Sequence, residues 1–323
     1  PSCATGGKLS SIGGSGRSGH SQRMVCESCE FVDTFLKLHP DVAVVLNIDA
    51  DHLDYFKTMD NLKASFRKFA EKATRVVIYN GDDANTVEAM AGLQKRTITF
   101  GYSETNDYYA ANIRHPGGVE TQFDLMKKGG ELVCSLRMHV PGEHNILNAT
   151  AACIAAFEAD ATPEDCVRGI DNFHGSGRRF EVLGKVNDIT VVDDYAHHPT
   201  EIEATLKAAR TLPFNRVWAV HQPFTYSRTY MLMDQFAQVL QLADRVVLSE
   251  IMGSREKNTL SVYTSQLAAR IPGAVWFPEF DEISSYVAEE ARPGDLIITL
   301  GCGDVDKCAH MILQKLQKRY PET

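Results

Sequence analysis

The sequence predicts an α/β protein of two domains, of which the second is built on a doubly wound, mainly parallel sheet. Two observations lead to this fold class. After residue 189, short apolar runs alternate with helical patterns, which is typical of right-handed βαβ crossovers. The chain also has 323 residues, a length that is long for one domain and comfortable for two.

Apolar runs in the first half are typical of buried parallel strands. The run Asp41–Ile48 reads DVAVVLNI, and Arg75–Tyr79 reads RVVIY. Alternating polarity predicts antiparallel strands near residues 97–102, 121–126 and 131–138. Helices are predicted at Asn61–Lys72, Ile146–Glu158 and Pro163–Asp171, the last with Thr162 as its N-cap.

Strands and helices alternate regularly in the second half. Strands are predicted at Thr190–Val192, Val217–Val220, Arg245–Leu248, Val275–Phe277 and Leu296–Leu300. Helices are predicted at Thr200–Leu212, Tyr230–Leu242, Tyr263–Arg270, Asp281–Ala291 and Val305–Lys318. The glycine-rich segment His174–Gly177 separates the two halves, so we place the domains at residues 1–177 and 178–323.

Residues 1–23 are rich in glycine and serine and show neither a helical nor a strand pattern. One interpretation of this segment is a linker or tail. The other is that the chain begins in the middle of a domain.

Composition excludes several classes of function. The formal net charge of -9 argues against a surface for nucleic acid or an anionic membrane. No apolar run approaches the length that spans a bilayer, and the first residues lack the apolar core of a signal peptide. The eight cysteines are scattered, which fits a cytoplasmic protein, and the pair Cys26 and Cys29 has no second pair to complete a zinc site. The oligomeric state stays open.

Ligands of doubly wound sheets bind at the carboxyl ends of the strands, so polar residues after each predicted strand are candidates. The segment Asn47–Asp54 reads NIDADHLD, and its carboxylates and His52 suit Mg²⁺ beside a phosphate. An acid-rich helix start explains the same residues equally well. Glu27 would complete a metal shell with His52, although alone it is typical of a surface acid.

Two further motifs suit nucleotide binding. Asn145 and Asn148 lie three residues apart at a helix start, where their amides suit a purine edge, although N-capping by Asn145 is the simpler interpretation. The segment Gly177–Glu181 reads GRRFE, and its paired arginines suit phosphate capture by a planar fork, with a solvated linker as the alternative.

The densest group of titratable residues is Asp193–Glu201, which reads DDYAHHPTE. A cap formed by Thr200 explains the start of the next helix but leaves the acids, tyrosine and histidines unexplained, so we interpret this segment as functional. Arg228 lies after the following strand, where it suits a clamp for a carboxylate, and a surface arginine is the alternative.

Six motifs, in this order, resemble those of the Mur ligases over almost the whole chain: NIDADHLD, PGEHNILNA, GSGRRFE, DDYAHHPTEI, QPFTYSRT and GDLIITLGCGD. The resemblance implies a partial Mur ligase central, ATP-binding domain at residues 1–177 and a Rossmann-like C-terminal domain at residues 178–323. DDYAHHPTEI with GRRFE is specific for the muramate-reading members. It therefore implies ligation of L-alanine to UDP-N-acetylmuramate, in which ATP first converts the muramoyl carboxylate to an acyl phosphate.

The resemblance also implies roles for single residues on the cofactor side. Glu27 and His52 match the ligands of Mg²⁺. Asn145 and Asn148 match the asparagines on the adenine side of ATP, and Arg179 matches the arginine that reaches the nucleotide phosphates.

Asp194, also on the cofactor side, matches the acid that holds the ATP ribose. Tyr195, His197 and Arg228 match residues that line the muramoyl and alanine end, so they are the predicted catalytic residues. Many family members carry a second arginine where this sequence has Thr225, which leaves open how the substrate carboxylate is held.

The sequence contains no G-x-x-x-x-G-K-[ST] phosphate loop. By the family pattern, residues 1–23 match a stretch downstream of that loop, so we expect the UDP-binding domain and the start of the ATP domain to be missing and the chain alone to be inactive. Two other functions stay open. One is a ligase that adds recycled tripeptide, and the other is a non-catalytic ligase fragment that binds ligands or a separate N-terminal piece.

Overall fold

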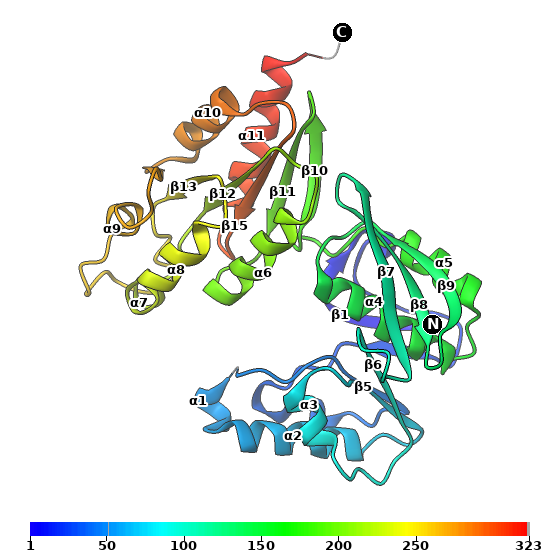
Figure 1. Ribbon diagram of the computed structural model, residues 1–323. Coiled ribbons are helices and arrows are strands. Elements are labelled where there is room, and N and C mark those ends of the chain that lie inside the picture. Colours follow the sequence, from blue (N-terminus) through cyan, green and yellow to red (C-terminus); the bar gives the residue numbers. More distant parts are fainter. Residues whose placement is uncertain (51, 322–323) are drawn as a thin grey trace. The chain divides into compact units, whose positions relative to one another are not determined.

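The computed structural model describes residues 1–50 and 52–321 and has the predicted α/β class, with mixed and mostly parallel sheets. The described residues form two compact units (Figure 1). Unit 1 comprises residues 1–116, 120–139 and 143–174, and unit 2 comprises residues 117–119, 140–142 and 175–323. Within the described part of the chain, no helix combines the length and apolarity needed to cross a membrane.

The main sheet of unit 1 has six strands in the order β4-β5-β6-β7-β8-β9. They are β4 (Val42–Val45), β5 (Val76–Asn80), β6 (Thr97–Gly101), β7 (Tyr108–Gly117), β8 (Glu120–Lys127) and β9 (Glu131–Met138). Strands β4 to β7 pair in parallel, whereas β8 and β9 pair antiparallel. The predicted parallel strands at β4 and β5 and the predicted antiparallel pair at β8 and β9 are confirmed.

Helices cover both faces of this sheet because successive residues of its strands point to opposite sides. On one face, Val77 of β5 packs in a cluster where Phe35 stacks on Phe69 of α2 (Met59–Glu71), with ring centroids 4.8 Å apart. On the other face, Ile78 packs against Ile154 of α4 (Glu143–Phe157). Shorter helical elements are α1 (Leu53–Phe56), α3 (Ala84–Met90), α5 (Pro163–Asp171), η1 (Ser10–Ile12) and η2 (Phe31–Lys37). The predicted cap of α5 is confirmed, since Thr162 accepts the N–H of Asp165.

The prediction that residues 97–102 form an antiparallel strand is wrong. Strand β6 pairs in parallel with both of its neighbours. Ile98 and Phe100 are buried on the α4 side, while the hydroxyl and backbone N–H of Thr99 donate to Asp107 at 3.0 and 2.8 Å. The alternating polarity of β6 therefore reflects apolar side chains on one face of the sheet and polar side chains on the other. It does not determine the direction of the strand.

Residues 2–26 contain three strands, so the linker interpretation of residues 1–23 is wrong. Strands β1 (Ser2–Leu9), β2 (Gly14–Arg17) and β3 (Met24–Cys26) form a sheet of order β2-β1-β3. Strand β1 pairs antiparallel with β2 and parallel with β3. A Cβ on Gly6 of β1 would lie 2.8 Å from Oε1 of Glu27, so a larger residue there would displace the flexible side chain of Glu27. Its glycine content hid this strand from a pattern search.

The sheet of unit 2 has the order β10-β11-β15-β12-β13-β14. Its strands are β10 (Glu181–Val186), β11 (Ile189–Asp194), β12 (Arg216–His221), β13 (Arg245–Ser249), β14 (Val275–Phe277) and β15 (Asp295–Leu300). All neighbours pair in parallel except β10, which is antiparallel to β11. The predicted doubly wound sheet is confirmed, and β10 is an added edge strand.

Helices lie on both faces of the unit 2 sheet (Figure 1). They are α6 (Pro199–Arg210), α7 (Tyr226–Met231), α8 (Met233–Leu240), α9 (Thr264–Ala268), α10 (Phe280–Glu290) and α11 (Asp306–Arg319). Ala219 of β12 faces the cluster formed with α6, α8 and α9, and the next residue, Val220, faces the cluster formed with α10 and α11. The helix predicted from residue 230 starts earlier, as α7, and is interrupted at Leu232.

Three strands of this sheet end level with one another. Strand β15 lies between β11 and β12, and its Leu300 is in register with both Asp194 and His221. The chain leaves β11 and β12 toward helices on one face and leaves β15 toward α11 on the other. A reversal of this kind is where ligands of doubly wound sheets bind.

Candidate active site

Five of the predicted site residues belong to unit 2 and lie at or beside this edge of the sheet: Arg179, Asp194, Tyr195, His197 and Arg228. The other four belong to unit 1: Glu27, His52, Asn145 and Asn148. The candidates are therefore divided between the two compact units.

The first arginine of the GRRFE motif anchors the start of unit 2 to the sheet. Arg178 donates from Nε to Oδ2 of Asp193 at 2.7 Å, and from its two Nη atoms to the carbonyls of Gly303 and Gly301 at 2.9 and 2.6 Å. The side chain of Asp193 is only 1% exposed and also accepts the hydroxyl of Thr299 at 2.6 Å. Burial raises the pKa of Asp193 even with the guanidinium of Arg178 beside it. Arg178 is therefore a structural residue.

The second arginine of the motif has a different environment. Arg179 is exposed and forms no ion pair among the described residues. Its guanidinium carbon lies 5.7 Å from the ring centroid of Tyr195, and that of Arg178 lies 5.1 Å from the same ring. A cation over an aromatic face is attracted by the ring quadrupole. Arg179 is thus positioned at the site with its charge exposed to solvent.

Asp194 is buried and binds backbone. Its Oδ2 accepts the N–H of Phe180 at 2.9 Å, and its Oδ1 accepts the N–H of Ala196 at 2.8 Å. Burial raises its pKa to about 6, although these two donors act in the opposite direction. Each carboxylate oxygen has a second acceptor site, so the observed bonds leave room for a ligand hydroxyl.

His197 lies directly after β11 and is held through one ring nitrogen. Its Nδ1 is 3.1 Å from the carbonyl oxygen of Tyr195 and 3.2 Å from Oε2 of Glu201. Its ring meets that of Tyr195 edge-on, with centroids 5.5 Å apart. Burial lowers the pKa of His197, so the imidazole is neutral at pH 7.

The prediction that Thr200 caps the next helix is wrong, because the cap of α6 is His198. The Nδ1 of His198 accepts the N–H of Thr200 at 3.4 Å, and the carboxylate of Glu201 accepts the N–H of His198 at 3.2 Å. Pro199 is the first helical residue, where its fixed φ and missing N–H are tolerated. The proline therefore sets the helix start two residues earlier than Thr200 would require.

Three buried polar atoms of unit 2 have no hydrogen-bond partner among the described residues: Nη1 of Arg228, Nε2 of His221 and Oε1 of Gln222. His221 is fully buried at the end of β12, with Nδ1 3.0 Å from the carbonyl oxygen of Leu300. Burial lowers its pKa to about 4, so the imidazole is neutral at pH 7. Buried polar atoms are nearly always satisfied in native proteins, so each of these three atoms is a candidate partner for a ligand or an ordered water.

Thr225 caps the helix that carries Arg228. Its hydroxyl accepts the N–H of Arg228, and its carbonyl accepts the hydroxyl of Thr229 at 2.7 Å. The carboxylate of Glu256 holds the same turn by accepting the N–H and hydroxyl of Ser227 at 2.8 and 2.5 Å. An arginine at residue 225 would lack the hydroxyl that forms this cap.

Replacing Thr225 by alanine is expected to lower the free energy of unfolding by about 1 kcal/mol, because an N-cap hydroxyl contributes that much. Urea unfolding at constant m-value measures the loss. Thr225→Ser retains the hydroxyl and should behave like the parent chain. Equal stability of the alanine and serine variants would show that the cap contributes nothing.

The two predicted metal ligands have different partners in unit 1. Oε2 of the exposed Glu27 accepts the N–H of Gly6 at 2.5 Å, whereas Nε2 of His52 lies 3.6 Å from Oε1 of Glu30. Among the described residues, no three His, Cys, Asp or Glu side chains are arranged to hold a metal ion. Asp51, which belongs to the same motif, lies outside the described residues.

The predicted adenine-side asparagines lie on one face of α4. Nδ2 of Asn148 donates to Oδ1 of Asn145 at 3.4 Å, and the helix turn brings the two residues together. Asn148 is exposed and Asn145 is half-buried. The face is therefore accessible to a ligand.

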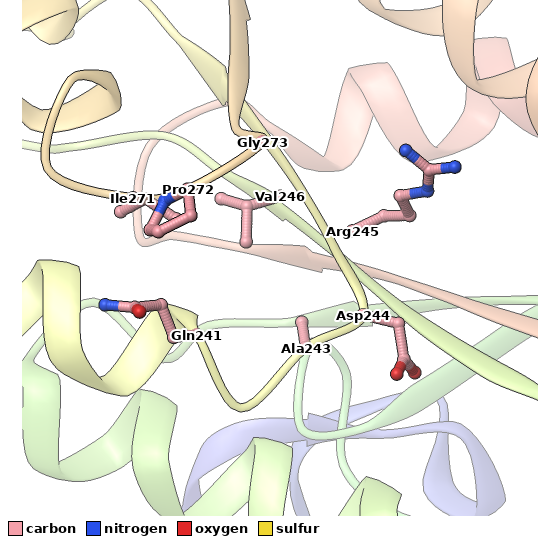
Figure 2. A pocket seen from close by; sticks show the side chains of 8 residues that line it. All are labelled: Gln241, Ala243, Asp244, Arg245, Val246, Ile271, Pro272 and Gly273. Carbon is pink, nitrogen blue, oxygen red and sulfur yellow. The ribbon is translucent and has the colours of Figure 1, made fainter.

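A pocket elsewhere in unit 2 does not coincide with the candidate site (Figure 2). It has a volume of about 220 Å³ and lies at the amino-terminal end of β13, beside Gln241, Asp244 and Arg245. Asp244 already accepts the N–H of Val217 and a guanidinium N–H of Arg210, both at 2.7 Å. Because Asp244 already has these two donors, its carboxylate is largely engaged within the protein.

Two models of protein domains match this chain, in the same order as the motifs in its sequence. Residues 18–156 match the Mur ligase middle domain, and residues 178–303 match the Mur ligase glutamate ligase domain. The chain is 39% identical over 324 residues to the UDP-N-acetylmuramate–L-alanine ligase of Caldanaerobacter subterraneus, covering 98% of this chain and 70% of the relative. The chain belongs to the Mur ligase family. Mur ligases are ATP-dependent enzymes that form amide bonds.

Two further Mur ligases show the same relationship. The UDP-N-acetylmuramate–L-alanine ligase of Acetivibrio thermocellus is 41% identical over 98% of this chain and 69% of its own length. The crystal structure of the UDP-N-acetylmuramate–alanine ligase of Thermotoga maritima has a TM-score of 0.80 at 23% identity, covering 99% of this chain and 69% of that one. This structural similarity confirms the Mur ligase fold.

Proposed function

We propose that this Mur ligase joins L-alanine to UDP-N-acetylmuramate in the cytoplasm, as a step of peptidoglycan precursor synthesis. The observation that carries the proposal is the gathering of Arg179, His197 and Arg228 around one edge of the unit 2 sheet, beside buried polar atoms without partners. The relatives at 39% and 41% identity, which are named for this reaction, support it.

In the proposed reaction, the γ-phosphoryl group of ATP passes to the muramoyl carboxylate, and the alanine amine then attacks the acyl phosphate. The exposed guanidinium of Arg179 binds nucleotide phosphate, for which a planar fork is suited. Asp194 accepts a ribose hydroxyl through an acceptor site that the backbone leaves open. Asn145 and Asn148 bind the adenine side.

The amino-acid end of the proposed site lies at the β11 and β12 loops. Nη1 of Arg228 donates to the carboxylate of alanine, which gives this buried donor a partner. Tyr195 and His197 line the same end, where the acyl phosphate and the amine meet.

The proposed ligands of Mg²⁺ are Glu27 and His52. The exposed carboxylate of Glu27 fits the ion, because Mg²⁺ prefers oxygen and keeps several water ligands. His52 would have to exchange its contact with Glu30 for the ion. When bound, Mg²⁺ neutralises charge on the transferring phosphoryl group.

A chimaeric ligase tests the proposed reaction, with residues 1–323 replacing the matched segment of the Acetivibrio thermocellus enzyme. We expect ADP release that requires both UDP-N-acetylmuramate and L-alanine. A folded chimaera that releases no ADP above background would refute the proposal. We expect the 323-residue polypeptide alone to be nearly inactive, because its sequence contains no phosphate loop to cradle ATP.

Replacing Arg179 by alanine in the chimaera is expected to weaken ADP binding by about 10- to 150-fold, the equivalent of one charge-assisted hydrogen bond of about 1.5–3 kcal/mol. Isothermal titration calorimetry measures the change. The unfolding midpoint should stay the same, because Arg179 is exposed. Arg179→Lys keeps the positive charge but lacks the planar fork, so its dissociation constant for ADP should lie between those of the parent and the alanine variant. An unchanged dissociation constant for ADP would remove Arg179 from the nucleotide site.

A further inference from the structure

The tautomer of His197 is fixed by its two neighbours. Nδ1 lies within 3.2 Å of the carbonyl oxygen of Tyr195 and of Oε2 of Glu201. Both of these oxygens only accept hydrogen bonds, so Nδ1 must carry the hydrogen. In the neutral imidazole the lone pair is then on Nε2, on the opposite side of the ring.

Glu201 is itself held in place by the start of α6. Its Oε2 accepts the backbone N–H of His197 at 2.9 Å and that of His198 at 3.2 Å. The backbone therefore holds the carboxylate of Glu201 in place independently of its contact with the imidazole of His197. A helix cap alone would explain those two backbone bonds, but it does not require the third contact, to Nδ1 of His197.

The charged groups around His197 have opposite effects on its imidazolium form. Glu201 on α6 favours that form, whereas Arg228 on α7 and Arg179 beside the site disfavour it. His221 at the end of β12 is neutral at pH 7. Burial also favours the neutral form, so His197 is available as a base.

We propose that Glu201 is a positioning residue that holds His197 with hydrogen on Nδ1, so that Nε2 accepts a proton from the ammonium group of the incoming amino acid. This inference rests on the proposed function. The ammonium transfers one proton to Nε2, and the imidazolium is stabilised by the carboxylate of Glu201. The amine lone pair then attacks the acyl carbon, the bond from that carbon to the phosphate oxygen breaks, and the second amine proton leaves with phosphate as hydrogen phosphate. His197 releases its proton to water.

Long-range ¹⁵N NMR of the histidine side chains in the 323-residue chain tests this inference without a ligase assay. The spectrum of His197→Gln, in which one set of signals is lost, assigns His197. We expect the Nδ1–H tautomer in the parent chain at pH 7. A hydrogen on Nε2 would overturn the proposal. The tautomer is measured in the parent chain, so this test needs no variant of Glu201.

The variant Glu201→Gln keeps an oxygen for the two backbone N–H groups but removes the charge. We expect the pKa of His197 to fall by about one unit or more, as for loss of a carboxylate in direct contact. The matched control is Glu203→Gln on the same helix, because Glu203 pairs with Lys207 at 2.8 Å instead. Equal pKa values in the two variants would overturn the proposal. A failure of the proposed ligase reaction would instead appear as absent ADP release, with these NMR signals unchanged.

Discussion

Replacing Arg178 by alanine is expected to lower the free energy of unfolding of unit 2 by about 3–5 kcal/mol. The variant removes three hydrogen bonds and leaves the carboxylate of Asp193 buried without its cation. An uncompensated buried charge is the main source of the loss, because a carboxylate taken out of water needs a partner. Urea or thermal unfolding of the 323-residue chain measures it.

The pH dependence of this loss has a definite sign. Burial already raises the pKa of Asp193, and removal of Arg178 raises it further. A carboxyl group whose pKa is higher in the folded than in the unfolded state destabilises the fold once it ionises. The deficit should therefore be largest at neutral pH and shrink as the pH falls toward the unfolded pKa of about 4.

Arg179→Ala is the matched control for this prediction, because it changes the next residue in the same motif. Its side chain is exposed, so the expected change in stability is within about 0.5 kcal/mol. Equal stability losses in the two variants would contradict the distinct roles of Arg178 and Arg179.

Replacing Arg228 by alanine in the chimaeric ligase is expected to reduce kcat/KM for L-alanine by about 30-fold to several thousand-fold. The estimate corresponds to about 2–5 kcal/mol for loss of one partner of a buried charge pair. Nη1 of Arg228 is buried and has no partner among the described residues, so a substrate carboxylate is the acceptor that would satisfy it. Steady-state kinetics with varied L-alanine measure the effect.

Arg228→Lys keeps the positive charge but loses the planar fork, so its kcat/KM should lie between those of the alanine variant and the parent. The KM for ATP should change little, because Arg228 is proposed to bind the amino acid. A loss confined to the KM for ATP would place Arg228 in the nucleotide site and contradict the assignment.

The repeated apolar runs predicted the fold of unit 2 well. Runs such as Val217–Val220 and Leu296–Leu300 are buried on both faces of a parallel sheet, which produces an unbroken apolar pattern. The pattern failed where burial is one-sided or the strand is polar. Strand β6 alternates although it is parallel, and β1 is too rich in glycine to be recognised.

The candidate site was predictable in location but not in detail. Polar residues after Asp194 and His221 were expected at one edge of the sheet, and both strands do end there, in register with Leu300 of β15. Which arginine of GRRFE is structural depends on whether its neighbours are buried, and a sequence pattern does not contain that information. For this reason the structural role of Arg178 was not predicted. Glu201 was recognised only as part of the DDYAHHPTE motif.

Identification of the product tests the central claim most directly. The chimaeric ligase is offered UDP-N-acetylmuramate, MgATP and equal concentrations of L-alanine and the L-Ala-D-Glu-diaminopimelate tripeptide, and mass spectrometry identifies the muramoyl product. We predict UDP-N-acetylmuramoyl-L-alanine as the main product, lost when Arg228 is replaced by alanine. A main product that carries the tripeptide, or no product from a folded chimaera, would contradict the account.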